Sequence, residues 1–253
     1  MTIRSAAVVA ALALLSAPAQ ATTVIDLGRT ADQSNSGRTD GQDGNVRSYS
    51  ADVDGTKVNV KAQGWTVIDG TIRQAFLGAY SGGGLGVTSS VEGNGSRSRH
   101  TVGNNTTIDF VTFQFDRLVT LDQMFLRAYG DTDAAILFDT TGLSQLAWHG
   151  SSAASILSGM TGGFLSNGTN QSGWRDIGAG DSAGDLWIIS AGNTVDANVD
   201  RFKVGTLSFS LAQQSAVPEP ATWLMLLLGF FGIGGVLRRR HEADSAANVA
   251  FAG

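Results

Sequence analysis

The chain lacks cysteine altogether and has little proline or histidine. Without a cysteine among its 253 residues it can form no disulfide, no thiolate metal site and no cysteine nucleophile. Its three histidines, His100, His149 and His241, form neither an HxH nor an HExxH pair, which argues against a histidine-based metal site. Only one glutamate, Glu92, lies between residues 22 and 216, so an acid/base pair in that region would have to use aspartates. We therefore expect no enzymatic activity.

The N-terminus has the features of an export signal. A basic start, Met1 to Arg4, precedes the apolar stretch SAAVVAALALLSA, which is too short to span a bilayer comfortably. Ala19 and Ala21 then form the small-x-small pattern that signal peptidase cleaves. We predict a signal peptide at residues 1–21, recognised by the secretion machinery, and a mature chain that begins at Thr22.

The body, residues 22–216, is mildly acidic. It contains ten arginines and three lysines against eighteen aspartates and one glutamate. Such a balance provides no electrostatic footprint for nucleic acid. Its anions are almost all aspartates, whose short side chains bond nearby backbone amides in turns and at strand ends.

The hydrophobic patterning of the body predicts strands. Short segments rich in β-branched and aromatic residues occur at residues 57–60, 107–115, 120–129, 134–139, 185–190 and 204–212. Both faces of residues 107–115 are apolar, with Phe110 on one side and Val111 and Phe113 on the other, which predicts a central strand. Residues 144–160 could form one short helix. We predict an all-β body, a β-sandwich or jelly roll in a single domain.

Turn-rich segments separate these strands. Glycine, Asn, Asp and Ser dominate residues 30–48, 78–100, 166–174 and 176–185, and no proline lies between Thr22 and Val217. Because proline is absent, we expect glycine to shape these connections.

Two aspartate clusters offer oxygen ligands of the kind that Ca²⁺ prefers. They are Asp40, Asp43 and Asn45 in TDGQDGN, and Asp131 and Asp133 in GDTDA. Neither fits an EF-hand loop, and we favour the interpretation that they are solvated turn aspartates. We expect no cofactor, unless Ca²⁺ binds at one of these clusters.

Exposed tryptophans would indicate sugar binding. Trp65, Trp148, Trp174 and Trp187 are available, although a tryptophan in a β-domain more often packs in the core. Trp187 lies in an apolar strand and is expected in the core. Trp174, in the turn-rich sequence NQSGWRD, is the better candidate for ligand binding.

The C-terminal region has the order of a membrane segment. Pro218 and Pro220 hold the sequence VPEP outside regular structure. The uncharged residues 221–237 follow, about 25 Å long as a helix, with Trp223 where an interfacial anchor belongs. Three arginines, Arg238 to Arg240, end this run and predict a cytoplasmic tail at residues 241–253. We predict a transmembrane helix here rather than a buried core helix.

Together these residues resemble a known sorting signal. Pro218-Glu219-Pro220, Trp223, Gly229-Phe230 and Arg238, Arg239 and Arg240 occur in the order of the PEP-CTERM signal, in its PEPxxW variety, of Gram-negative bacteria. The resemblance covers residues 217–240. It implies that an exosortase, an integral membrane transpeptidase-like enzyme, recognises Pro218 to Pro220 and releases the body to the cell surface or the extracellular matrix of a biofilm.

Three functions remain open from the sequence. The leading hypothesis is a non-enzymatic surface or matrix protein that is sorted by its C-terminal signal. The second is an exported module that binds or cleaves carbohydrate, with extracellular polysaccharide as its partner. The third is a membrane-tethered domain that is never cleaved.

Overall fold

The computed structural model describes the body in several stretches and a few residues near the C-terminus. The described residues are 21–28, 32–33, 44–92, 100–140, 148–166, 168, 170–180, 182–192, 198–212, 228–231, 233 and 238. The chain divides into two units, Met1–Ala212 and Gln213–Gly253, which are described separately below. The predicted signal peptide up to residue 20, Asp40 and Asp43 lie outside the described residues.

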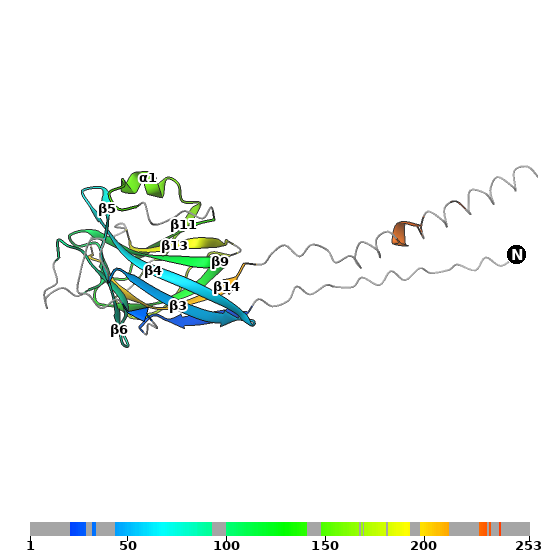
Figure 1. Ribbon diagram of the computed structural model, residues 1–253, viewed down its shortest axis with the longest axis horizontal. Helices are drawn as coiled ribbons and strands as arrows, with labels where there is room; N and C mark the ends of the chain where they lie inside the picture. The colour runs from blue at the N-terminus through cyan, green and yellow to red at the C-terminus, as the bar shows by residue number, and fades with distance from the viewer. Residues whose placement is uncertain are drawn as a thin grey trace, which may run out of the picture. The chain divides into compact units, whose positions relative to one another are not determined.

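The body is built almost wholly of antiparallel strands, as predicted (Figure 1). Its strands join in one 14-stranded hydrogen-bonded network, whose main path runs β11-β10-β13-β9-β14-β7-β6. The strands are β1 (Thr22–Asp26), β2 (Asp32–Gln33), β3 (Val46–Val53), β4 (Thr56–Ile68), β5 (Thr71–Gln74), β6 (Phe76–Tyr80), β7 (Gly84–Thr88), β8 (Val102–Gly103), β9 (Ile108–Ala128), β10 (Ala134–Asp139), β11 (Gly162–Ser166), β12 (Gly173–Asp176), β13 (Gly184–Ala191) and β14 (Arg201–Leu211).

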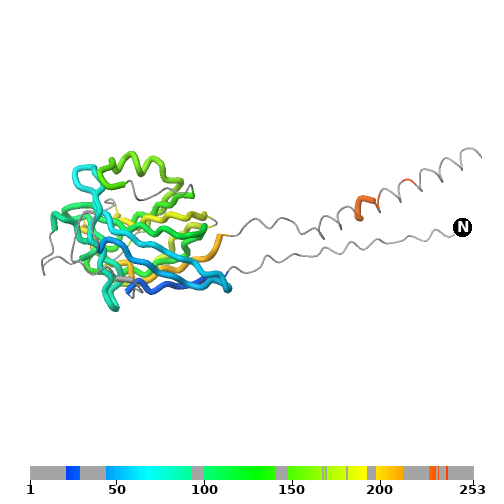
Figure 2. Tube along the Cα trace, in the orientation of Figure 1, coloured from blue at the N-terminus to red at the C-terminus, as the bar shows by residue number. Residues whose placement is uncertain are grey.

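The long strand β9 connects two halves of this network (Figure 2). One half contains β4 and β13, and the other contains β14 and β12. Its N-terminal part pairs with β4 and β13, whereas its C-terminal part pairs with β14 and β12. Two separate strands, at residues 107–115 and 120–129, were expected here, and that expectation is wrong. The linking residues Asp116, Arg117 and Leu118 are exposed but include no glycine or proline, so nothing forces the chain to turn.

Two tight turns connect three strands in the first half of the chain. Asp54-Gly55 joins β3 to β4, and Asp69-Gly70 joins β4 to β5. All four residues have positive φ, between 48° and 75°. This is the conformation of a type I′ turn, whose twist matches that of the flanking strands and which favours the Asp-Gly pair.

A glycine-rich segment expected to be a connection forms a hairpin instead. Within residues 78–100, most of β6 and all of β7 pair antiparallel. A Cβ on Gly84 would overlap with the carbonyl oxygen of Val204, and one on Gly86 with that of His100. These glycines therefore permit β7 to lie against its neighbours, a close approach that a search for turn residues misreads as a loop.

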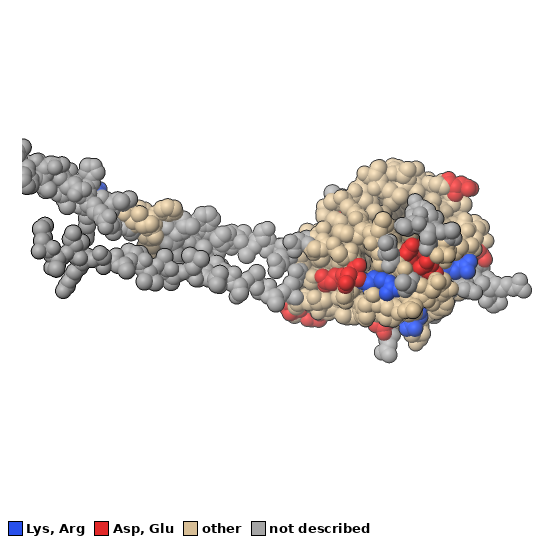
Figure 3. All heavy atoms as spheres, turned by 180° about the vertical axis from the view of Figure 1, so that it is seen from behind, with Lys and Arg blue, Asp and Glu red and all other residues tan. Residues whose placement is uncertain are grey.

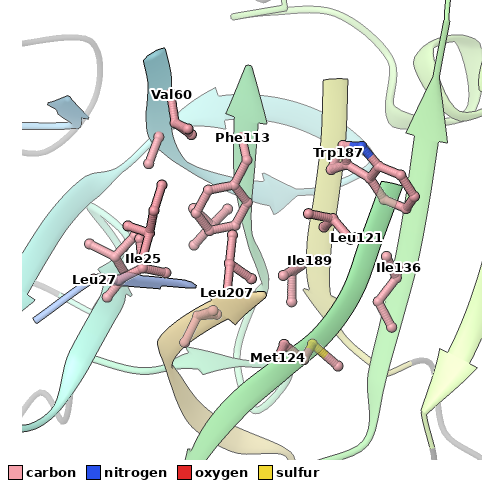
Figure 4. Close-up of a cluster of buried hydrophobic side chains, with 14 of the residues drawn as sticks. Ile25, Leu27, Val60, Phe113, Leu121, Met124, Ile136, Trp187, Ile189 and Leu207 are labelled. Atoms are coloured by element: carbon pink, nitrogen blue, oxygen red, sulfur yellow. The ribbon is translucent and has the colours of Figure 1, made fainter. Parts of the chain in front are cut away.

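The main core lies between the inner faces of the two halves (Figure 4). Phe113 and Trp187 contribute from the β4-β9-β13 half and Leu207 from β14, and all three are at most 1% exposed. Phe115 and Phe209 meet edge to face across this core, with ring centroids 5.2 Å apart. Trp187 is in the core, as predicted.

A second, smaller core covers the opposite face of the β4-β9-β13 half. It contains Trp65, Ile72, Phe110, Trp148, Leu186 and Ile188. The alternation expected for residues 107–115 is confirmed, because Phe110 packs in this cluster while Val111 and Phe113 pack in the main core. The short helix α1 (Ala153–Leu157) lies over this face and falls within the segment where a helix was considered.

Candidate functional sites

Three aspartates from two separate parts of the chain come together beside β10 and β14. Asp131 and Asp133 precede β10, and Asp200 precedes β14. One carboxylate oxygen of each lies within 4.8 Å of the others. Asp131 is 7% exposed and Asp200 2%. The structure thus brings together the two aspartates singled out from the sequence and adds a third.

Backbone and amide groups hold these carboxylates in place. Asp200 exchanges two hydrogen bonds with Asn104: Asn104 Nδ2 donates to Asp200 Oδ2 (2.6 Å), and Asp200 N donates to Asn104 Oδ1 (2.9 Å). Asp131 Oδ1 accepts from the Thr132 amide (2.7 Å), and Asp133 Oδ1 accepts from the Gly168 amide. The cluster is therefore positioned by its own loops.

The spacing of the three oxygens suits a cation with oxygen ligands. Ca²⁺ binds oxygens at about 2.3–2.6 Å, so ligand oxygens on opposite sides of the ion lie about 5 Å apart. The cluster of Asp131, Asp133 and Asp200 could therefore hold one such ion. Asn45, from the other aspartate cluster, is buried at 5% exposure in the loop before β3.

Trp174 lies on the outer face of β12. It is 45% exposed, whereas Trp65, Trp148 and Trp187 are at most 2% exposed. Its ring meets Phe125 of the paired strand β9 edge to face, with centroids 5.7 Å apart. The guanidinium of Arg127 lies 5.7 Å from the centre of the same Phe125 ring. An exposed indole thus stands beside a second ring and a cation.

Arg175, next to Trp174, links β12 to the loop that contains Asp131 and Asp133. Arg175 Nη2 donates to Thr132 Oγ1 (3.3 Å) and to the carbonyl oxygen of Gln171 (2.9 Å). Thr132 lies between Asp131 and Asp133. A cation held by the carboxylate cluster would therefore stiffen the loop that supports β12.

Asp109 is a buried carboxyl on β9 that sequence reasoning did not single out as a site. Burial, and then the charge of Glu92, raise the pKa of Asp109 well above its ordinary value. Thr107 Oγ1 donates to Asp109 Oδ1 (3.1 Å). Asp109 is 2% exposed. Its protonated form is thus favoured by the fold.

The sequence analysis missed a motif that is typical of a nucleophilic serine. Residues 180–184, GDSAG, fit G-x-S-x-G, the signature of a nucleophile that stands on a strand-to-helix turn. In the structure this segment ends where β13 begins, and no helix follows it. The local fold therefore does not supply the context that the pattern requires.

Charge is interspersed on the face of the molecule shown in Figure 3. Acidic and basic side chains lie side by side there, on a surface that is mostly uncharged. The face offers a ligand short-range contacts rather than a broad field of one sign.

The second unit, Gln213–Gly253, contributes a helical stretch around residue 230. Leu228, Phe230, Phe231 and Ile233 are helical and 56–74% exposed. Of the predicted motif residues, Gly229 and Arg238 are described, whereas Pro218, Glu219, Pro220, Trp223, Arg239 and Arg240 lie outside the described residues. None of the helical segments in the described part of the chain has the length and apolar character of a membrane-spanning helix.

In the sequence, Pro218 and Pro220 precede this exposed apolar stretch, and three arginines at residues 238–240 follow it. Residues 216–240 match the family model for the PEP-CTERM protein-sorting motif. The motif supports an exported protein that is targeted by an exosortase and associates with the membrane. Comparison with curated proteins and with solved structures found no match.

Proposed function

We propose that this chain is a non-enzymatic surface or extracellular-matrix protein whose body is released from the membrane by exosortase cleavage at Pro218-Glu219-Pro220. The observation that carries this proposal is the match of residues 216–240 to the sorting motif. The body ends compactly at Ala212, whose amide donates to the Leu118 carbonyl oxygen (3.0 Å). Cleavage at the motif would therefore leave every strand of the body intact.

The predicted N-terminal processing fits the same fold. The first strand, β1, begins at Thr22, the residue after the proposed signal peptidase site at Ala21. Thr22 to Asp26 pair with Ser210 to Thr206 of β14. We infer that the mature body resembles a β-sandwich and that its first and last strands lie side by side.

Mass spectrometry of the protein from a host that has an exosortase tests the proposal. The expected mature chain lacks the residues after the motif. Replacing Pro218, Glu219 and Pro220 with alanine should leave the C-terminus intact, whereas Gln214→Ala, just outside the motif, should be processed normally. An intact C-terminus in the unaltered protein would instead support a domain that stays tethered.

The exposed face around Trp174 supports a second candidate function, binding of extracellular polysaccharide. Sugar rings stack on exposed indoles, and the neighbouring Arg127 could contact an acidic sugar. Affinity electrophoresis in gels containing matrix polysaccharide, with and without a chelator, tests this. Retardation should be lost in Trp174→Ala and kept in Leu165→Ala, which removes another exposed apolar side chain. Equal mobility of all three proteins in the presence and absence of polysaccharide would exclude this function.

A further inference from the structure

An apolar cavity of about 200 Å³ lies between helix α1 and the outer face of the sheet. Its walls come from β4, β5, β9, β10, β13 and α1, and none of the lining residues carries a charge. Trp148 and Phe110 belong to the walls, and both pack in the smaller core. The cavity adjoins that core but is not filled by it.

The way α1 is attached explains why the cavity is not filled. The segment around the helix is tied down on both sides: the amide of Ala153 donates to Gly70 O (2.9 Å), and that of Thr161 donates to Phe138 O (2.9 Å). The helix has only five residues, and none of them is buried. It therefore covers the sheet without placing enough side-chain volume against it.

The lining determines what kind of molecule the cavity can take. Besides the indole of Trp148, its one polar side chain is Ser190, which donates to the carbonyl oxygen of Ala191 (3.0 Å). A charged or strongly polar guest would lose its hydration without gaining a matching partner. Water is also held poorly, because an ordered water needs about two to four polar partners and this lining offers few.

We propose that this cavity is a binding site for a small, neutral, apolar molecule about the size of a single substituted aromatic ring. The volume matches such a guest, and the rings of Trp148 and Phe110 allow edge-to-face contacts with it. Ile108 and Leu157 also line the cavity and are 41% and 48% exposed, so the site is open to solvent at this edge. The site is independent of the sorting segment and of the Trp174 face.

Toluene is a suitable probe, and isoleucine methyl groups are the readout. The full chain, held in lipid nanodiscs and labelled at isoleucine δ-methyl groups, is titrated with toluene and followed by NMR. Ile72, Ile156 and Ile188 line the cavity and should show saturable ring-current shifts. Ile25 and Ile189 pack in the main core and should not move. Ile233, in the apolar C-terminal stretch, reports toluene that merely dissolves in lipid.

Plugging variants test whether the shifts arise in the cavity. Ala153→Phe fills it from α1, and Ala135→Phe fills it from β10, so either should abolish the saturable shifts. Ala154→Phe adds the same side chain at the exposed neighbouring position and should leave them unchanged. Absence of saturable shifts in the unaltered protein, or their persistence in a folded plugging variant, would overturn the proposal. The two plugging substitutions lie on different elements, so one variant still tests the proposal if the other misfolds.

Discussion

Asn104 and Asp200 exchange a pair of hydrogen bonds across the chain, with the Asn104 amide donating to the carboxylate and the Asp200 backbone amide donating back. Asn104 Nδ2 also donates to the carbonyl oxygen of Gly192 (3.0 Å). This one side chain therefore joins the loop after β8, the loop after β13 and the start of β14. It also fixes the carboxylate that completes the acidic cluster.

Replacing Asn104 should destabilise the body measurably. Asn104→Ala removes the bonds to Asp200 and Gly192, and buried groups that lose hydrogen bonds cost about 1–3 kcal/mol each. Urea unfolding should show this loss. Asn59→Ala is the control, since it removes a side-chain amide that donates to the carboxylate of Asp116 (2.7 Å) at an exposed position. An equal effect of both substitutions would contradict the structural role given to Asn104.

Calcium should raise the thermal midpoint of unfolding. Three carboxylates whose oxygens lie within 4.8 Å repel one another, and an ion that binds only the folded state relieves this and stabilises it by mass action. At a Ca²⁺ concentration about 100 times the dissociation constant, the gain is about 2.7 kcal/mol. Calorimetry with calcium and with EDTA measures the difference.

Two aspartate-to-asparagine variants separate a specific site from general ionic effects. Asp133→Asn keeps an acceptor for the Gly168 amide but removes one charge, so the calcium-dependent shift should largely disappear. Asp54→Asn lies in the exposed β3–β4 turn, where Asn tolerates the positive φ, and should leave the shift intact. The same calcium response in both variants would argue for solvated aspartates at residues 131 and 133.

The carboxylate cluster shows how far local sequence can predict a site. Asp131 and Asp133 are visible as a pair because they are two residues apart and flanked by turn residues. Asp200 lies 67 residues from Asp133 and is brought near only by the packing of β14 against the rest of the sheet. No local pattern encodes that proximity, so the third carboxylate could not be predicted.

The bounds of a strand were predictable where one sequence pattern ran through the whole segment. β10 was predicted with its bounds, Ala134 to Asp139, because five consecutive apolar residues and a closing aspartate stand between turn signals. β7 was missed, since its glycines look like turn residues and are explained only by distant partners such as Val204. In this region the sequence analysis predicted only part of β4 and neither β3 nor β5. The two Asp-Gly pairs could have predicted the hairpins that join these three strands.

Asp109 should make stability depend on pH. Its folded-state pKa is raised, chiefly by burial, so the folded chain keeps a proton that the unfolded chain releases near pH 4. The stabilising contribution is complete below the unfolded pKa and is lost as pH rises toward the folded pKa. The free energy of unfolding should therefore fall over this range, and urea unfolding at a series of pH values measures it.

Asp109→Asn should flatten this pH dependence and raise stability at neutral pH, because the amide stays uncharged and can still accept from Thr107. Glu92→Gln should act in the same direction but less, since the Glu92 charge is the smaller cause of the raised pKa. Asp69→Asn, in the exposed β4–β5 turn, provides the control and should leave the pH profile unchanged. An unaltered profile in Asp109→Asn would assign the dependence to other groups.

Gly86 should be the glycine least tolerant of alanine in β7. An added Cβ would overlap with the backbone carbonyl of His100, and a backbone cannot rotate away as a flexible side chain can. Relief requires that β7 or the segment before β8 move, which should cost about 3 kcal/mol and lower the thermal midpoint by several degrees. Gly159→Ala is the control: its nearest contact would be 3.4 Å away, so its stability should change little. Similar midpoints for the two variants would mean that β7 does not lie as close to the His100 backbone as the structure places it.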